Sequence, residues 1–217
     1  KITVPENGNI SITQTHNINN PLIWSVEKPN LYNLRTTIIQ DGKKIDNNNT
    51  VIGLRTISFD ANKGFFLNGQ NMKIKGVCLH HDAGCLGSAV PKEVLRYRLE
   101  KLKETGCNAI RTSHNPQAPA LYELCDELGF LVMDEAFDEW EFAKKKWVKG
   151  WNQGEPTMDG HSEFFNEWGE KDLRDMVLRD RNHPSVIMWS IGNEVDYPND
   201  PYSHPILDKE GIQQQHT

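Results

Sequence analysis

The 217-residue sequence lacks long hydrophobic runs, paired cysteines and an excess of positive charge. No apolar stretch approaches the roughly 20 residues of a membrane-spanning helix, so a membrane is not expected as a partner. The four cysteines form no C-x-x-C pair, which disfavours a zinc or redox site. The net charge is −6, with acidic and basic residues interspersed. Because phosphate binding requires a basic face, nucleic acid is not expected as a partner either.

Two further motifs are missing from the sequence. The stretch "GCLGSAV" has neither the spacing nor the lysine of a phosphate-binding loop, and no G-x-S-x-G nucleophile elbow occurs. The sequence opens on Lys1 without a signal peptide, so its start does not reveal a compartment. A periplasmic or secreted location is expected in preference to a cytoplasmic one. Cys78, in a strand-like run, and Cys125, on an apolar helix face, are expected in the core.

Residues 1–60 have the pattern of β-strands and no helical period. The stretch "NISITQTH" alternates, "NLRTTIIQDGKKI" holds a strand and an Asp-Gly turn, and "NTVIGLRTISFD" has another strand pattern. Such strands are typical of an antiparallel sandwich, but they are too few to close one. Residues 1–60 are therefore predicted to form part of a β-sandwich.

Residues 61–217 change to alternating strands and helices. Helical spacing appears in "PKEVLRYRLEKLKETG", "APALYELCDELG" and "SEFFNEWGEKDLRDMVLRDRNHP", where Leu173, Met176 and Val177 are expected to face inward. The apolar runs "MKIKGVCL", "NAIRTS", "FLVM" and "SVIMWSI" flank these helices. The order strand, helix, strand, helix, strand, helix, strand predicts parallel βα units.

Polar residues follow each of the four apolar runs. The clusters are His80-His81-Asp82, Arg111 with Ser113-His114-Asn115, Asp134-Glu135 and Asn193-Glu194. In a parallel α/β fold the carboxyl ends of the strands share one edge, where binding and catalytic sites are assembled. One such cluster is usually an N-cap or a solvated turn, but four at one edge predict a site.

The residue types in these clusters favour carboxylate acid–base chemistry on a polyhydroxyl substrate. A metal is the minor interpretation, because His80 and His81 point to opposite faces of a strand and no His-Glu-x-x-His motif occurs. Asn, His, Asp and Trp offer a sugar hydrogen bonds and flat apolar faces. Glycoside hydrolysis uses two carboxyl groups, one of them a general acid with a raised pKa.

Two long motifs, "RTSHNPQAPALYELCDELGFLVMDEAFDEW" and "RDRNHPSVIMWSIGNE", resemble glycoside hydrolase family 2, the family of β-galactosidases, β-glucuronidases and β-mannosidases. The segments "PLIWSVEKPNLYNLRTTI", "IGLRTISFD" and "GFFLNGQNMKIKGVCLHHD" are similar to the family's lead-in to its barrel, so the resemblance covers nearly the whole chain. It implies part of an immunoglobulin-like β-sandwich in residues 1–60. Residues 61–217 then hold the first four βα units of a TIM (β/α)₈ barrel.

The resemblance also implies a retaining mechanism, with a Glu acid/base after strand four and a Glu nucleophile after strand seven. Glu194 matches the acid/base. The other matched residues are the substrate-contacting His80 and His114, Asn193 beside the sugar's 2-hydroxyl, Arg111 in support of the nucleophile, and Asp134 and Glu135 as binding residues that shape the site.

Two departures from the family pattern limit what carries over. Some β-galactosidases bind Mg²⁺ through a Glu and a His just after "DEA". The corresponding residues here are Glu139 and Glu141, so the histidine is missing and no metal or cofactor is expected. The nucleophile position lies beyond residue 217, and the segment alone is expected to be inactive.

The leading functional interpretation is a segment of a retaining exo-glycosidase that cleaves terminal β-galactosides of oligosaccharides or polysaccharide fragments. A β-glucuronidase or β-mannosidase is the alternative within the family, since "CLHHD" replaces the "NRHE" of the best-known galactosidases. A non-catalytic carbohydrate-binding piece is the alternative of another class. The sequence does not indicate an oligomeric state.

The polar segment from Asp138 to Gly160 contains Trp140, Trp147 and Trp151. Two hypotheses apply to these rings, which either stack on sugar or pin the segment onto the barrel. The charge run Lys144 to Lys146 is expected to be a solvated loop face.

Overall fold

A computed structural model describes residues 2–141, 143–144 and 160–195 of the chain. The strands are β1 (Tyr32–Gln40), β2 (Lys43–Ile52), β3 (Ile57–Asp60), β4 (Gly64–Leu67), β5 (Gln70–Asn71), β6 (Gly76–Leu79), β7 (Ala109–Thr112), β8 (Leu131–Glu135) and β9 (Val186–Ser190). The helices are α1 (Lys92–Glu104), α2 (Pro119–Leu128) and α3 (Phe165–Asp180), with short 3₁₀ turns η1 (Gly84–Leu86) and η2 (His161–Glu163). None of the helices in these residues is long and apolar enough to cross a bilayer.

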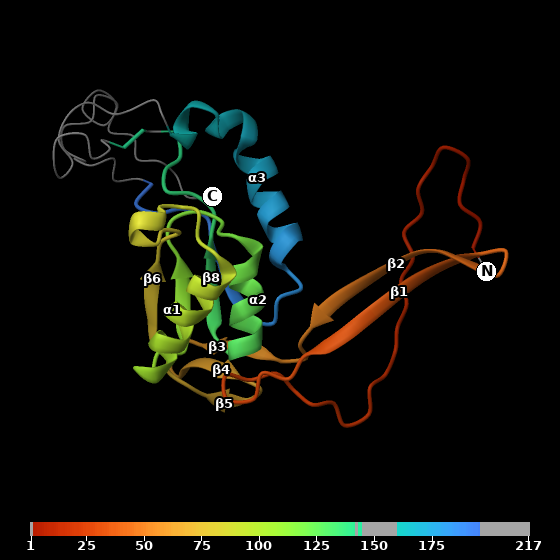
Figure 1. Cartoon of the computed structure of the whole chain (residues 1–217), viewed down its shortest axis with the longest axis horizontal. Coiled ribbons are helices and arrows are strands. Elements are labelled where there is room, and N and C mark those ends of the chain that lie inside the picture. Colours follow the sequence, from red (N-terminus) through yellow and green to blue (C-terminus); the bar gives the residue numbers. More distant parts are fainter. Residues whose placement is uncertain (1, 142, 145–159, 196–217) are drawn as a thin grey trace.

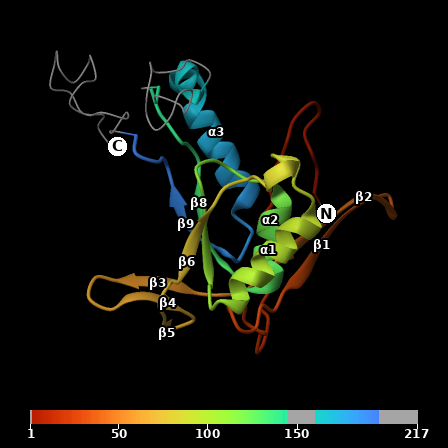
Figure 2. The same cartoon turned by 60° about the vertical axis from the view of Figure 1, so that its left-hand side comes forward.

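The centre of the fold is a four-stranded parallel sheet in the order β6-β7-β8-β9. Helices α1, α2 and α3 all lie on one side of this sheet (Figure 2). Each helix connects one parallel strand to the next, as the alternating sequence pattern predicts. The prediction of parallel βα units is therefore confirmed.

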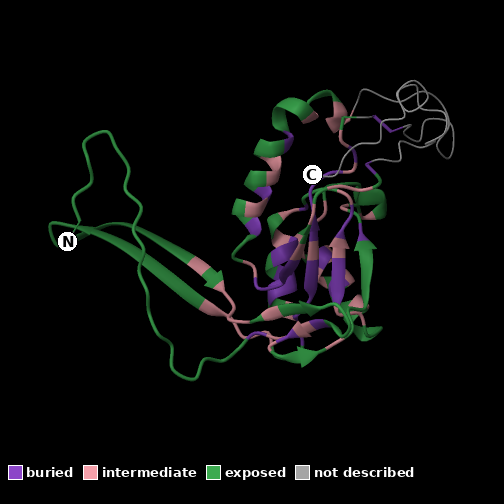
Figure 3. Cartoon of the chain, turned by 180° about the vertical axis from the view of Figure 1, so that it is seen from behind, coloured by how far each residue is buried: buried purple, intermediate pink, exposed green. Residues whose placement is uncertain are grey.

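The core between the sheet and the helices follows the apolar spacing of the sequence. In α2, Leu121, Leu124 and Cys125 are fully buried and pack against Ile110 of β7 and Val132 of β8. Buried residues accordingly concentrate in the parallel strands and the helices over them (Figure 3). Burial of this stripe is the main term that holds the helices on the sheet.

The opposite face of the parallel sheet is open among the described residues. A groove of about 180 Å³ runs along it, lined by inward-facing residues such as Met133 and Met188. Cys78 lies on this face and is exposed, so the prediction that it is a core residue is wrong. Its strand neighbour Leu79 points toward the helices and is buried, because successive side chains of a strand alternate between faces.

The three-stranded sheet β3-β4-β5 covers the amino-terminal ends of the parallel strands (Figure 1). Phe65, Leu67 and Trp24 pack there against Leu131 and Ile187. Arg55 makes a second connection to this end of the sheet. Its Nε donates to Pro184 O at 2.7 Å, and its Nη2 donates to Val186 O at 2.5 Å. The lead-in to the barrel is thus anchored on the start of β9.

The amino-terminal region lacks one of the strands that the sequence suggests. Strands β1 and β2 make an antiparallel hairpin that extends away from the parallel sheet (Figure 1). Its two-residue turn is Asp41-Gly42, with both φ values positive, as a type I′ turn requires. The strand predicted within "NISITQTH" does not form, and residues 9–16 are exposed. A strand needs a hydrogen-bonding neighbour, and no described segment pairs with these residues.

Gly129, which ends α2, provides a test of this packing. Its φ is +74°, and a Cβ there would lie 2.2 Å from Val26 O. Gly129→Ala should lower the melting temperature of the protein far more than Gly106→Ala. Gly106 ends α1 with φ +84° but has open space around it, so alanine there costs only the left-handed backbone, about 1–2 kcal/mol. Equal losses in the two variants would show that the contact with Val26 does not constrain the fold.

Candidate active site

The carboxylate of Glu135, at the carboxyl end of β8, is fully buried and joins three parallel strands. Arg111 of β7 donates to it twice, from Nε at 2.7 Å and from Nη2 at 2.9 Å. Ser190 of β9 donates from Oγ at 2.7 Å, and the Nδ1 atom of His114 lies 2.6 Å away. A buried carboxylate is costly unless charged and hydrogen-bonding groups surround it, so these partners are what permits Glu135 to be buried.

Arg111 extends the cluster to the segment after β9. Its Nη2 atom also donates to Asn193 Oδ1 at 2.9 Å. The hydrogen bond to Glu135 raises the pKa of the Arg111 guanidinium despite partial burial, so the group keeps its charge. One guanidinium therefore fixes both the buried carboxylate and the side-chain amide of Asn193.

A second charged pair holds Asn193 from the other side. Asn193 Nδ2 donates to Asp138 Oδ1 at 3.3 Å, and Lys144 Nζ donates to the same oxygen at 3.0 Å. Lys144 Nζ also donates to the backbone carbonyl of Asn193 at 2.8 Å. Lys144 is buried, so the prediction of a solvated loop face is wrong for this residue; residues 145 and 146 lie outside the described chain.

Glu194 follows directly and is exposed, with a φ of +49°. A positive φ is uncommon for a residue with a side chain, and the surrounding structure must hold it. The chain is closely packed two residues earlier, because a Cβ on Gly192 would lie 2.5 Å from Val195 Cγ1 and 2.8 Å from Trp140 Nε1.

Trp140 has contacts of the kind that pin a segment in place. Its indole donates to Ile191 O at 2.9 Å and stacks on Phe165 of α3, with ring centroids 5.6 Å apart. These contacts favour the pinning hypothesis for Trp140. Trp147 and Trp151 lie outside the described residues.

His80 is exposed just after β6, and its ring meets that of His114 edge-to-face at 5.1 Å. The structure therefore brings together residues from all four strand ends. The cluster consists of His80, Arg111, His114, Glu135, Ser190 and Asn193, with Glu194 next in the chain. Ser190 and Lys144 were not expected from the sequence, because a Ser in a strand or a Lys in a charge run carries no signal of its place in the fold.

Asp134 does not belong to this cluster, and its expected binding role is wrong. It faces the helices, fully buried, and accepts hydrogen bonds from Tyr122 Oη at 2.7 Å and Thr112 Oγ1 at 3.2 Å. The physical reason is the alternation of side chains along β8, which sends Glu135 inward and Asp134 outward. Burial, together with the nearby Asp180 carboxylate, raises the pKa of Asp134 to about 7.

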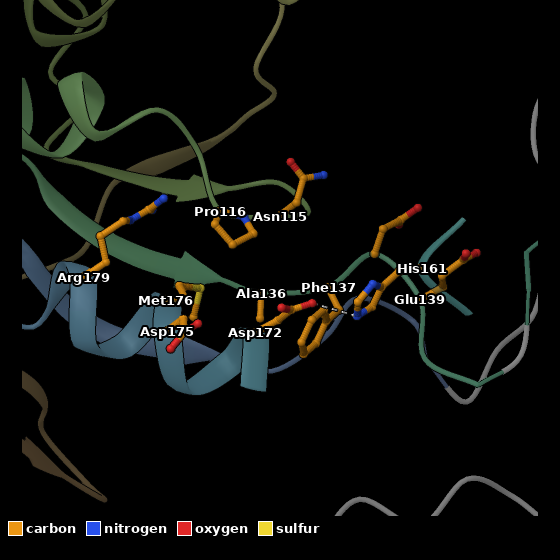
Figure 4. Close-up of a pocket in the computed structure, with 11 residues that line it drawn as sticks. Asn115, Pro116, Ala136, Phe137, Glu139, His161, Asp172, Asp175, Met176 and Arg179 are labelled. Carbon is orange, nitrogen blue, oxygen red and sulfur yellow. Dashed lines mark ion pairs between the residues drawn. The ribbon is translucent and has the colours of Figure 1, made fainter. Parts of the chain in front are cut away.

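A cavity of about 570 Å³ lies between the segment after β8 and helix α3 (Figure 4). Its lining includes Phe137, on which the ring of His161 stacks at 4.8 Å, and Asp172 of α3, 3.7 Å from His161 Nε2. None of its lining residues is Glu135, Asn193 or Glu194. This cavity is adjacent to the cluster at the strand ends, because Asp138, which accepts a hydrogen bond from Asn193 Nδ2, lines it.

Glu139, one of the two residues named for a metal, accepts hydrogen bonds from two backbone N–H groups. The Oε2 atom of Glu139 accepts the backbone N–H of Lys144 at 3.0 Å, and its Oε1 accepts that of Ser162 at 3.3 Å. Glu141 is exposed. Within the described ranges no three His, Cys, Asp or Glu side chains gather as a metal site would require.

The parallel sheet, its helices on one side and its polar strand ends define the class of domain, which is a segment of a TIM barrel. Residues 60–209 match the TIM barrel domain of the glycosyl hydrolases family 2, and residues 1–55 match a second model of glycosyl hydrolases family 2. The chain belongs to glycosyl hydrolase family 2, as the sequence resemblance indicates.

Relatives and solved structures agree with this assignment. A β-galactosidase from Bacteroides ovatus is 51% identical over 186 residues, which are 86% of this chain and 20% of that protein. A β-glucuronidase from Formosa agariphila, described as putative, is 45% identical over 80% of this chain and 16% of its own length. A β-glycosidase structure from Bacteroides vulgatus matches 90% of this chain and 23% of its own, with a TM-score of 0.74 and 44% identity. The chain thus spans about a fifth of the length of such relatives.

The pairing of Arg111 with Glu135 is testable by charge removal. Arg111→Met should destabilise the protein by on the order of 3–5 kcal/mol, because it leaves a buried carboxylate without its cation. The double variant Arg111→Met/Glu135→Gln should recover part of this loss in unfolding experiments. If the double variant is less stable than Arg111→Met, the charge of Glu135 is not what requires Arg111.

The raised pKa of Asp134 predicts a pH dependence of stability. Between about pH 4 and 7 the folded state holds a proton that the unfolded state releases, so this residue's contribution to stability falls as the pH rises. Asp134→Asn removes the titration, and the melting temperature of the variant relative to the parent should be higher at pH 8 than at pH 5. Asp41→Asn, in an exposed turn, is the control. The difference between its melting temperature and that of the parent should be the same at both pH values.

Proposed function

We propose that this chain carries the acid/base part of the active site of a retaining exo-glycosidase that hydrolyses terminal β-galactosides. The observation that supports this most is the Asn193–Glu194 turn, where an exposed carboxyl group follows an amide held by Arg111 and Asp138. An exposed carboxyl group at the carboxyl edge of a TIM barrel suits general acid catalysis.

In the proposed first step, Glu194 protonates the glycosidic oxygen while a carboxylate from outside this chain attacks the anomeric carbon. In the second step, Glu194 takes a proton from the water that hydrolyses the covalent intermediate. The amide of Asn193 has two N–H donors, of which one reaches Asp138. We assign the other N–H to the sugar's 2-hydroxyl, and His80 and His114 to other hydroxyls of the substrate.

Glu135 is a poor candidate for the nucleophile. Its carboxylate is fully buried and is occupied by Arg111, His114 and Ser190. A nucleophile must instead lie about 5–5.5 Å from the acid/base, on the other side of the scissile bond. We therefore assign the nucleophile to a carboxylate outside this chain.

The second candidate substrate is a β-glucuronide. It is favoured by relatives named β-glucuronidase, including the 31% identical enzyme of Bacteroides fragilis. A screen of the full-length protein on 4-nitrophenyl β-galactoside, β-glucuronide and β-mannoside separates these specificities. Binding of sugar without turnover on any of the three would favour the non-catalytic interpretation.

The role of Glu194 has a direct test in the full-length protein. Glu194→Gln should lower kcat/KM on an alkyl β-galactoside by about 10²–10⁴-fold, since it removes general acid catalysis. The loss should be smaller on the 4-nitrophenyl glycoside, whose leaving group needs little protonation. Glu167→Gln on the exposed face of α3 is the control and should leave both rates unchanged. A near-normal rate of Glu194→Gln on the alkyl glycoside would contradict the assignment.

A further inference from the structure

We infer that Lys144 is a positioning residue for Glu194, and that its ammonium group fixes the peptide that carries this carboxyl group. The inference rests on the proposed function, because it assigns Lys144 a task in placing the acid/base. It assigns no contact between Lys144 and the substrate.

The surroundings of Lys144 are those of a fixed charge. Only 10% of its side chain is exposed, and Nζ lies 3.0 Å from Asp138 Oδ1 and 2.8 Å from Asn193 O. Removing an ammonium from water is costly unless it is paired and hydrogen-bonded, so the observed contacts restrict where Nζ can lie. A lysine side chain is long and flexible in solution, but here the ammonium group of Lys144 donates to two defined acceptors.

Lys144 contacts a different part of Asn193 than Arg111 and Asp138 do. Arg111 holds Oδ1 and Asp138 holds Nδ2, so both orient the side-chain amide. In the contacts among the described residues, Lys144 is the one of these three that reaches the main chain of Asn193, at its carbonyl. Because the peptide bond is planar, fixing that carbonyl also fixes the plane of the bond that leads into Glu194.

The conformation of Glu194 makes such a restraint necessary. Its φ of +49° lies in the left-handed region, which is unfavourable for a residue with a side chain and persists only where the surroundings enforce it. Its side chain is exposed, so core packing does not aim the carboxyl group. The direction of the carboxyl group therefore depends on the backbone, and a misplacement of about 1 Å can cost a catalytic group on the order of 10²-fold in rate.

The contact also joins two segments that are distant in sequence. Lys144 follows β8, whereas Asn193 follows β9. The ammonium–carbonyl contact thus couples the position of the segment after β8 to the peptide that precedes Glu194. This link is separate from the Trp140 contact, which acts two residues earlier, on Ile191 O.

The test compares two substrates in the full-length protein, methyl β-galactoside and 4-nitrophenyl β-galactoside, or the matching pair for the sugar found in the screen. The measured quantity is kcat/KM on the methyl glycoside divided by kcat/KM on the 4-nitrophenyl glycoside. This ratio does not depend on the folded fraction of a preparation, because both values scale with it. Lys144→Met should lower this ratio by roughly tenfold or more, because a misplaced acid chiefly slows the substrate that needs protonation. Lys144→Arg, which keeps the charge and the donors, should move the ratio back toward that of the parent.

Lys103→Met is the matched control, since Lys103 Nζ also donates to backbone carbonyls, those of Val26 and Leu128, near the other end of the sheet. It should leave the ratio unchanged. Lys144→Gln replaces Lys144→Met if the latter does not fold. An unchanged ratio in the Lys144 variant, or no recovery with arginine, overturns the inference. An unchanged ratio in Glu194→Gln instead overturns the proposed function itself, which keeps the two failures distinguishable.

Discussion

The carboxyl edge of the parallel sheet depends on one buried carboxylate, that of Glu135. A carboxylate without water requires donors on every side, and here they come from Arg111, His114 and Ser190. These partners belong to, or directly follow, the strands on either side of β8. The requirement to satisfy one charge thus aligns three strand ends and directs the guanidinium of Arg111 toward Asn193.

The alternation of β8 gives two neighbouring acids opposite surroundings. Glu135 faces the inner side, where its charge is met by a guanidinium. Asp134 faces the helices, where burial and the Asp180 carboxylate favour its neutral form and raise its pKa. Asp180 itself is paired with Arg179 at 2.6 Å. Two residues with the same chemistry therefore serve different ends, one at the candidate site and the other between the sheet and α3.

The segments after β8 and β9 form one unit at the candidate site. Trp140 contacts Ile191, and Lys144 contacts Asn193. At Gly192, between Ile191 and Asn193, the neighbouring side chains leave no room for a Cβ. Each contact falls on the main chain near Glu194. The shape of the turn that bears this carboxyl group is accordingly set by residues about fifty positions earlier in the chain. The proposed acid/base role rests on that turn, and Lys144 is the contact that we assign to it.

The sequence by itself determined the order of the four parallel strands and the three helices that connect them, and the edge at which the polar clusters meet. Apolar spacing in α1, α2 and α3 and the β-branched runs between them are local properties that favour one type of element each. The strand expected in residues 9–16 did not form, because pairing depends on a neighbour that local pattern does not reveal.

Only the tertiary structure decided which face each strand-end residue occupies. A shift of one residue along β8 exchanges the side chains that face the site with those that face the helices. The sequence "DE" therefore does not say which of the two acids lies at the site. The same holds for Lys144, which a local charge run predicts to be solvated but which the fold buries against Asp138 and Asn193. Burial of a charge depends on partners that are distant in sequence, and those partners meet only when the strands are in register.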